Sequence, residues 1–150
     1  MKLFNKFIYI AFILLINTDS YSAGEFKLIS VNNQTDSLMR FVYSCLTNPD
    51  VITWDDLDSN TTKKYGKKII KLPKNRIFGF NLIKCKSEDE VLYNKHCWIE
   101  VKDGEIKLFN GLRTSDYKLI SDEEINESHN YLVNLIIKSD DTIQMQVIQE

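Results

Sequence analysis

The chain has 150 residues, of which 43% are hydrophobic and 27% are charged, and this composition predicts one globular domain and excludes a disordered chain. Five glycines and two prolines leave no room for a long flexible linker. The net charge of −2 gives no general attraction to nucleic acid or to an anionic membrane surface, and we expect no direct binding of nucleic acid.

The first residues have the pattern of an export signal. Lys2 and Lys6 precede an unbroken apolar run, Phe7–Ile16, and small residues follow it. This run is too short to cross a bilayer comfortably, because about 20 apolar residues are needed. We predict a cleaved signal peptide over residues 1–23, with a retained N-terminal membrane anchor as the alternative. Residues 24–150 would then form a single periplasmic domain.

A strand and a helix are predicted at the start of this domain. Glu25–Val31 has the composition of a short strand, and Asn33–Asp36 supplies residue types that cap helices. Apolar residues then recur at the spacing of one helix face, at Leu38, Phe41, Val42 and Cys45. Pro49 would end this helix, because a proline disfavours helical backbone at the preceding residue. Val51–Trp54 is a candidate edge strand.

Strands dominate the predicted middle of the chain. Lys68–Leu72 predicts a short strand and Arg76–Lys86 a longer one. The longer strand has apolar residues on both faces, which predicts a central strand that is covered on both sides.

The most specific local pattern is a hairpin over residues 94–110. Cys97 alternates with His96 and Trp98, so His96 and Trp98 share one face of the strand and Cys97 lies on the other. Asp103-Gly104 follows, the dipeptide that a two-residue hairpin turn prefers. We expect this hairpin to form a wall that presents a face to a partner or a ligand.

The end of the chain predicts a second helix between two strands. A weak strand covers Tyr117–Ile120, and Ser121–Glu124 reads as a capping box. The helix would carry one stripe of side chains, at Ile125, His129, Leu132 and Ile136. Thr142–Gln149 alternates as a final strand. The predicted fold class is α+β, an antiparallel sheet or incomplete β-barrel of about six to eight strands with two helices.

Export would place all three cysteines in an oxidising compartment. Cys85 and Cys97 would lie on neighbouring strands, so they are the first choice for a disulfide, and Cys45 would be buried on the first helix. Three cysteines leave one unpaired within the chain.

A thiol-enzyme site is one alternative. Cys45, His96 and Asn110 follow the order of transglutaminase-like thiol enzymes. A catalytic thiol needs a lowered pKa, which a helix N-terminus supplies. Cys45 would lie near a helix C-terminus instead, which argues against this alternative, and we expect the protein not to be an enzyme.

Metal and cofactor sites find no support in the sequence. His96 and Cys97 are adjacent on a strand, so they point to opposite faces and cannot bind one ion together. No glycine-rich phosphate loop is present. We expect no metal and no cofactor.

Binding of a small apolar ligand within a barrel or half-barrel is a further possibility. The candidate lining residues are Phe78, Phe80, Ile106 and Leu108. Plain core packing is the more common role of such residues. The unpaired edges of the sheet, such as the C-terminal strand, could also be completed by a partner protein.

The order of several short segments resembles a known family. Glu25-Phe26-Lys27-Leu28 follows an apolar N-terminal segment, Leu72-Pro73-Lys74-Asn75 precedes a long strand, and Trp98 opens the strand that turns through Asp103-Gly104. This layout, over most of residues 7–150, resembles ToxS and the related VtrC and TcpH proteins of Vibrio. These are small inner-membrane or periplasmic partners of a transmembrane transcription regulator.

The resemblance implies a role in virulence regulation without catalysis. Such a protein forms a heterodimer with the periplasmic domain of a membrane-bound transcription regulator, stabilises it and promotes its activity. In the VtrC case the two chains share a barrel that binds bile salts. The cysteines do not follow the ToxS pattern, and the short apolar run differs from the ToxS anchor. A secreted or periplasmic inhibitor or immunity protein, with Trp54 as an exposed anchor, is the main alternative.

Overall fold

The computed structural model describes residues 24–45, 48–66, 70–112 and 116–150. Strands and the turns between them account for these residues, and no helix occurs among them. The expected α+β fold with two helices is therefore wrong, and the described part of the chain is all-β. The predicted signal peptide, 1–23, lies outside the described residues.

Sheet A contains five strands, and its central strand is the first in the chain. Strand β1 pairs in parallel with β10, which pairs antiparallel with β11; on its other side β1 pairs antiparallel with β4 and, further along, with β5. The strands of this sheet are β1 (Phe26–Asn33), β4 (Thr61–Lys64), β5 (Ile70–Leu72), β10 (Tyr131–Ile137) and β11 (Ile143–Gln149).

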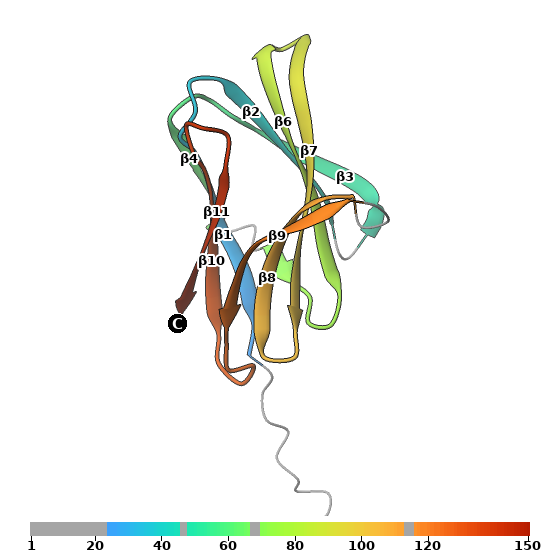
Figure 1. The fold of residues 1–150 in the computed structure, drawn as a ribbon, viewed down its shortest axis with the longest axis vertical. Helices are drawn as coiled ribbons and strands as arrows, with labels where there is room; N and C mark the ends of the chain where they lie inside the picture. The colour runs from blue at the N-terminus through green and yellow to red at the C-terminus, as the bar shows by residue number, and fades with distance from the viewer. Residues whose placement is uncertain (1–23, 46–47, 67–69, 113–115) are drawn as a thin grey trace, which may run out of the picture.

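Sheet B contains six antiparallel strands in the order β3-β2-β6-β7-β8-β9. These strands are β2 (Leu38–Cys45), β3 (Asn48–Leu57), β6 (Ile77–Ser87), β7 (Glu90–Lys102), β8 (Glu105–Gly111) and β9 (Tyr117–Glu124). The tip of the β6–β7 hairpin projects beyond the rest of the molecule (Figure 1).

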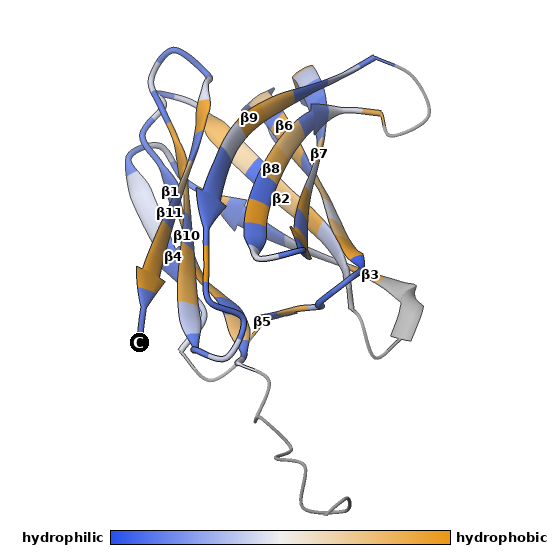
Figure 2. Cartoon of the chain, turned by 60° about the horizontal axis from the view of Figure 1, so that its bottom comes forward, coloured by the Kyte–Doolittle hydropathy of each residue, from blue (hydrophilic) through white to orange (hydrophobic). Residues whose placement is uncertain are grey.

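The two sheets face each other and do not close into a barrel. Strand β9 at one edge of sheet B approaches β11 at one edge of sheet A, but the two are not hydrogen-bonded. Between the sheets lies one core cluster, to which both contribute buried side chains. Hydrophobic and hydrophilic residues alternate along the strands, as β8 shows in Figure 2, because only one face of each sheet meets this core.

The first predicted helix is strand β2. The helical spacing of Leu38, Phe41 and Val42 coincides with an alternation of buried side chains at Met39, Phe41 and Tyr43. Aromatic and β-branched residues favour the pleated conformation, and pairing with both β3 and β6 fixes it.

The second predicted helix is replaced by the end of β9, a turn, and β10. Ser121 to Glu124 continue the edge strand β9 instead of capping a helix. In β10 every second side chain is buried, from Tyr131 to Ile137, which is a strand pattern. Parallel pairing with β1 stabilises this strand, and no local sequence signal announces that pairing.

The hairpin prediction is confirmed. Strands β7 and β8 pair from Lys102–Glu105 to Cys97–Asn110, and the turn between them is Asp103-Gly104. Asp103 has φ 55° and Gly104 has φ 75°, the left-handed values that a type I′ turn requires at both positions. Strand β6 lies between β2 and β7, so the central position predicted for Arg76–Lys86 is confirmed, but the strand is not covered on both sides, since Gly79 is exposed.

The expected disulfide is absent: Cys85 and Cys97 are both buried free thiols. In the register of β6 and β7, Cys97 is opposite Phe80 and Cys85 is opposite Val91. Five residues along a strand separate Phe80 from Cys85, a distance of about 16 Å at the usual rise, and a disulfide needs Cα atoms within about 7 Å. The prediction that the two cysteines lie on neighbouring strands is correct, but they are not opposite each other in the register of these strands.

Candidate binding surface

The side of sheet B that faces away from the core carries two rows of residues across its six strands. Their neighbours along each strand, such as Phe80 and Cys97, point into the core. The first row is Ile52, Ser44, Gly79, Trp98, Phe109 and Leu119, and the second is Trp54, Val42, Asn81, His96, Gly111 and Tyr117. We call these twelve residues the outer face.

No residue of the outer face is Asp, Glu, Lys or Arg, and four are aromatic. Of the eight large hydrophobic side chains that are exposed in the described part of the chain, four lie on this face, and Leu112 follows it directly. Trp54 is 61% exposed and Tyr117 is 55% exposed. Contiguous exposed apolar surface of this kind marks interaction sites, whereas isolated exposed residues are common everywhere.

Trp98 is the fixed centre of the outer face. Its indole stacks on Phe109 at a centroid distance of 5.0 Å and an interplanar angle of 15°, and it meets the edge of Tyr117 at 5.3 Å. These rings leave Trp98 only 6% exposed although it points away from the core. Three aromatic rings from β7, β8 and β9 therefore form one packed layer on the outside of the sheet.

Beside Trp98 the outer face is hollowed. The hollow is open to solvent, has a volume of about 330 Å³, and is mostly apolar. Gly79 is opposite Trp98 in the register and lies beneath the hollow, and a Cβ built on this glycine meets no atom within 4 Å. Residues that line it include Val42, Ser44, Ile52, Asn81 and His96.

Charged residues begin at the border of the hollow, where Glu100 is the next residue after Trp98 on the same face of β7. Ile77 lines the hollow and pairs with Glu100, which continues a row through Lys107 to Asp122. Glu105 hydrogen-bonds to the Lys107 ammonium and is the main cause of its raised pKa, and the charges of Asp122 and Glu100 add to the effect.

The opposite border of the outer face holds a neutral ion pair. Arg40 on β2 donates to Asp56 on β3, with Nε 2.7 Å from Oδ1 and a second nitrogen 3.2 Å from Oδ2. The Asp56 carboxylate raises the pKa of the Arg40 guanidinium. An uncharged centre between charged borders is the usual arrangement of a protein interface.

The four predicted ligand-lining residues lie in the core. Phe78, Phe80, Ile106 and Leu108 are all buried within the cluster between the sheets. Phe80 alone among them also borders the hollow. These side chains therefore pack in the core, which is the more common role of such residues.

The residues of the thiol-enzyme alternative are not brought together on one face. His96 lies on the outer face, whereas Asn110 is opposite Cys97 in the register. The Cys97 thiol points toward Asn110 Oδ1 at 3.9 Å, and burial raises its pKa to about 12. The side chain of Cys45 lies outside the described residues, but its backbone belongs to a strand and offers no helix N-terminus.

The described residues contain no group of three or more His, Cys, Asp and Glu side chains that could hold a metal ion. Within the same ranges, we find no helix of the length and apolarity that crossing a membrane requires.

Comparison with known proteins gives no relative. No family model matches the chain, no curated protein matches its sequence, and no solved structure matches its fold.

Sequence reasoning found part of the outer face and missed the rest. The alternation around Cys97 predicted that His96 and Trp98 share a face. The contribution of Ile52, Gly79 and Tyr117 depends on the strand order, which brings these distant segments side by side. Trp98 on β7 and Phe109 on β8, which the predicted hairpin places on neighbouring strands, were the available signal.

Proposed function

We propose that this protein is an exported binding protein that forms a heterodimer with the periplasmic domain of a membrane-bound transcription regulator and stabilises it. The observation that carries the proposal is the outer face of sheet B, an uncharged surface with exposed aromatic side chains. Tyr and Trp are the residues in which binding energy at protein interfaces concentrates. The export signal and the resemblance to the ToxS family support the choice of partner.

The open sheet edges give a second reason to expect a protein partner. Strands β3 and β9 end sheet B without a further strand, and unpaired backbone groups at such edges can pair with another chain. A bile salt inside the sandwich is not part of the proposal, because the side chains expected to line such a site are packed against one another.

The test is a thermal melt of the purified protein with the periplasmic domain of a regulator encoded beside its gene. We expect a midpoint that rises with the concentration of the added domain, because a partner that binds only the folded state stabilises it. An unchanged midpoint at a tenfold excess of the domain, or the absence of such a gene, would sink the proposal.

A second candidate function is inhibition of an enzyme as a secreted inhibitor or immunity protein. The exposure of Trp54 favours it, because an edge-strand indole can insert into a cleft of another protein. Co-purification with a hydrolase, together with loss of that hydrolase's activity, would support this function over the first. Binding to a regulator domain alone would contradict it.

A further inference from the structure

We propose that the hollow above Gly79 receives an apolar side chain from a protein segment whose neighbouring residues are basic. The inference rests on the proposed function, since it specifies how the outer face binds a partner protein. The chemistry of the segment that the hollow would bind does not depend on which protein carries this segment.

The first step is that the hollow is a formed receptor for a side chain. Gly79 has no side chain, and among the described residues beyond its two chain neighbours no atom lies within 4 Å of the point where its Cβ would be. Aliphatic side chains of Val42, Ile52 and Ile77 border this space. A hollow of about 330 Å³ lies within the range of ligand pockets, which are roughly 300–1,000 Å³. An apolar side chain that enters it removes apolar surface on both molecules from water.

The second step is that the wall of the hollow is held in place before binding. Trp98 is stacked on Phe109 and packed against Tyr117, so its indole cannot turn into the hollow without breaking both contacts. Gly79 and Trp98 are on paired central strands of the sheet. A preorganised pocket loses little conformational entropy on binding, and interface anchors concentrate at pockets of this kind.

Polar side-chain atoms also border the hollow. Ser44, Asn81 and His96 supply a hydroxyl, an amide and an imidazole, and each can hydrogen-bond to the backbone of an incoming segment. None of the described residues that line the hollow is Asp, Glu, Lys or Arg, so this part of the lining offers no ion-pair partner for a charged anchor. The anchor is therefore an apolar side chain.

The charges at the border of the hollow indicate the charge of the flanking residues. Two charged rows continue from the border at Ile77, namely Glu100, Lys107 and Asp122, then Lys102, Glu105 and Glu124. Four carboxylates and two ammonium groups give these two rows a net charge of −2. The Arg40–Asp56 pair on the other side is neutral. Charge complementarity therefore favours a segment with Lys or Arg next to its anchor.

The test is selection of a random peptide library, displayed on phage, against the purified protein. We expect the enriched peptides to carry an aromatic or large aliphatic residue flanked by Lys or Arg. Calorimetry with these synthetic peptides should show at least tenfold weaker binding to Gly79→Val. Gly66→Val is the matched control, because a Cβ at Gly66 also meets no atom within 4 Å and this glycine is outside the hollow. It should bind as the wild type does.

Three further variants, one of them a control, test the charge of the bound segment without filling the hollow above Gly79. Ile52→Lys changes an exposed side chain at the border of the hollow and should repel the basic peptides, weakening binding at least threefold. Glu100→Lys should act in the same direction, and Glu90→Lys at the tip of the β6–β7 hairpin should have no effect. Higher salt should weaken binding to the wild type.

Several results would overturn the inference. These are the enrichment of no peptide over the bare support, enriched peptides that are acidic or lack an apolar residue, and equal binding to wild type and Gly79→Val. A regulator domain that fails to bind, with peptides selected as expected, would refute the partner and leave the site standing. A regulator domain that binds Gly79→Val as well as the wild type would refute the site alone.

Discussion

Asn33 is the most completely buried polar side chain among the described residues, with none of its surface exposed. Its Oδ1 accepts from the Thr35 amide at 3.0 Å and from the Thr35 hydroxyl at 2.8 Å. Its Nδ2 donates to the carbonyls of Ser37, Leu57 and Asp58, at 2.8, 3.0 and 2.9 Å. One amide therefore joins the end of β1 to the start of β2 and the end of β3.

Replacing this amide should weaken the fold strongly. Asn33→Ala leaves buried carbonyl and hydroxyl groups without a partner, and we expect the free energy of unfolding to fall by about 3 kcal/mol. Urea denaturation measures the loss. Gln34→Ala is the control, because this neighbouring side chain is exposed and its loss should cost less than about 0.5 kcal/mol. Equal losses for the two variants would contradict the role given to Asn33.

The same residues explain one error of sequence interpretation. Asn33 and Thr35 were interpreted as helix caps, and they do bond side chain to backbone as caps do. Asn126 with Ser128 and Asp140 with Thr142 repeat the arrangement at two other turns. Asx and Ser/Thr side chains stabilise turns by the same bonds that cap helices, so local sequence alone does not separate the two.

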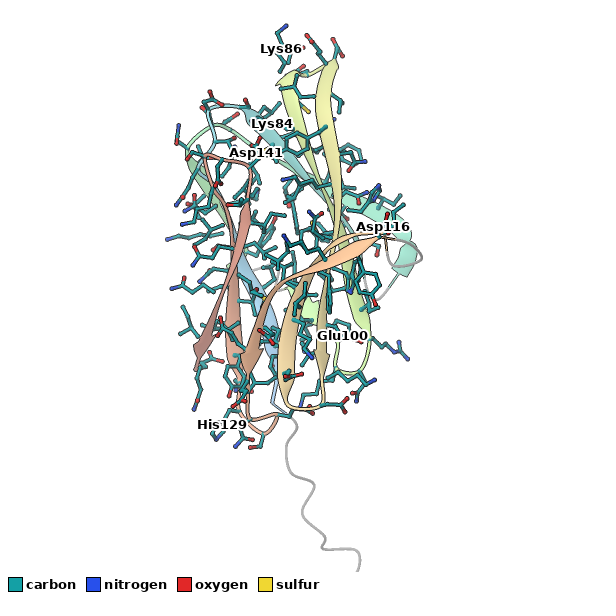
Figure 3. The ribbon with its side chains drawn as sticks, in the orientation of Figure 1. Lys84, Lys86, Glu100, Asp116, His129 and Asp141 are labelled. Carbon is teal, nitrogen blue, oxygen red and sulfur yellow. The ribbon has the colours of Figure 1, made fainter. Side chains whose placement is uncertain are left out.

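At the scale of elements, the turn between β10 and β11 is tied to the β6–β7 hairpin. Lys84 on β6 donates to both carboxylate oxygens of Asp141 at 2.9 and 3.1 Å, and Figure 3 shows these two residues close together at the top of the molecule. Lys95 on β7 donates to the Asp141 carbonyl oxygen. Both ammonium groups also lie over the Tyr93 ring. This cluster connects sheet A to sheet B away from the core.

Breaking the cluster should loosen one end of the sandwich. Asp141→Asn keeps a residue that tolerates the φ of 64° at this turn and removes only the charge. We expect a loss of about 1–2 kcal/mol, because the pair is partly buried, with side-chain exposures of 13% and 29%. Hydrogen exchange at the β10–β11 turn should speed up.

Lys86→Met is the matched control for this cluster. Lys86 is on the same strand as Lys84, but its ion pair with Glu90 is exposed on both sides, and its loss should cost at most about 0.5 kcal/mol. If Asp141→Asn changes the unfolding free energy no more than Lys86→Met does, the two sheets do not depend on this contact.

Prediction from sequence succeeded where the elements are specified locally. The hairpin of β7 and β8 follows from Asp103-Gly104 and from strict alternation, and the long central strand β6 follows from apolar residues on both faces. The two helix predictions were wrong because a short apolar segment can satisfy a 3.6-residue and a two-residue period at once. The segment of the second predicted helix forms strand β10 because it pairs in parallel with β1. This pairing joins residues about a hundred positions apart, so it cannot be recognised from local sequence.

At the scale of the whole molecule, the hydroxyl groups of two tyrosines and one buried thiol make stability depend on pH in the alkaline range. Burial, with the Asp55 charge in addition, raises the pKa of Tyr65, and burial next to Asp141 raises that of Tyr93. Burial raises the pKa of the Cys97 thiol to about 12. In the unfolded chain these groups ionise near their ordinary values, about 8.5 for Cys and 10 for Tyr.

Stability should therefore decrease as the pH rises. Below about pH 8.5 both states keep these protons, and above it the unfolded state releases protons that the folded state retains. We expect the urea midpoint to fall steadily between about pH 9 and pH 11. Tyr65→Phe should make this fall shallower, because it removes one of the groups whose pKa is raised by burial. A midpoint that is constant or rises over this range would contradict the assignment.

The pairing of β1 with β10 also sets the order in which the molecule can be completed. During synthesis the first strand of sheet A leaves the ribosome about a hundred residues before the strand that pairs with it. Until then one side of β1 has no neighbour, and contacts of such sequence separation form slowly. Sheet A therefore cannot be completed until β10 has been synthesised, and we expect folding to finish late in synthesis.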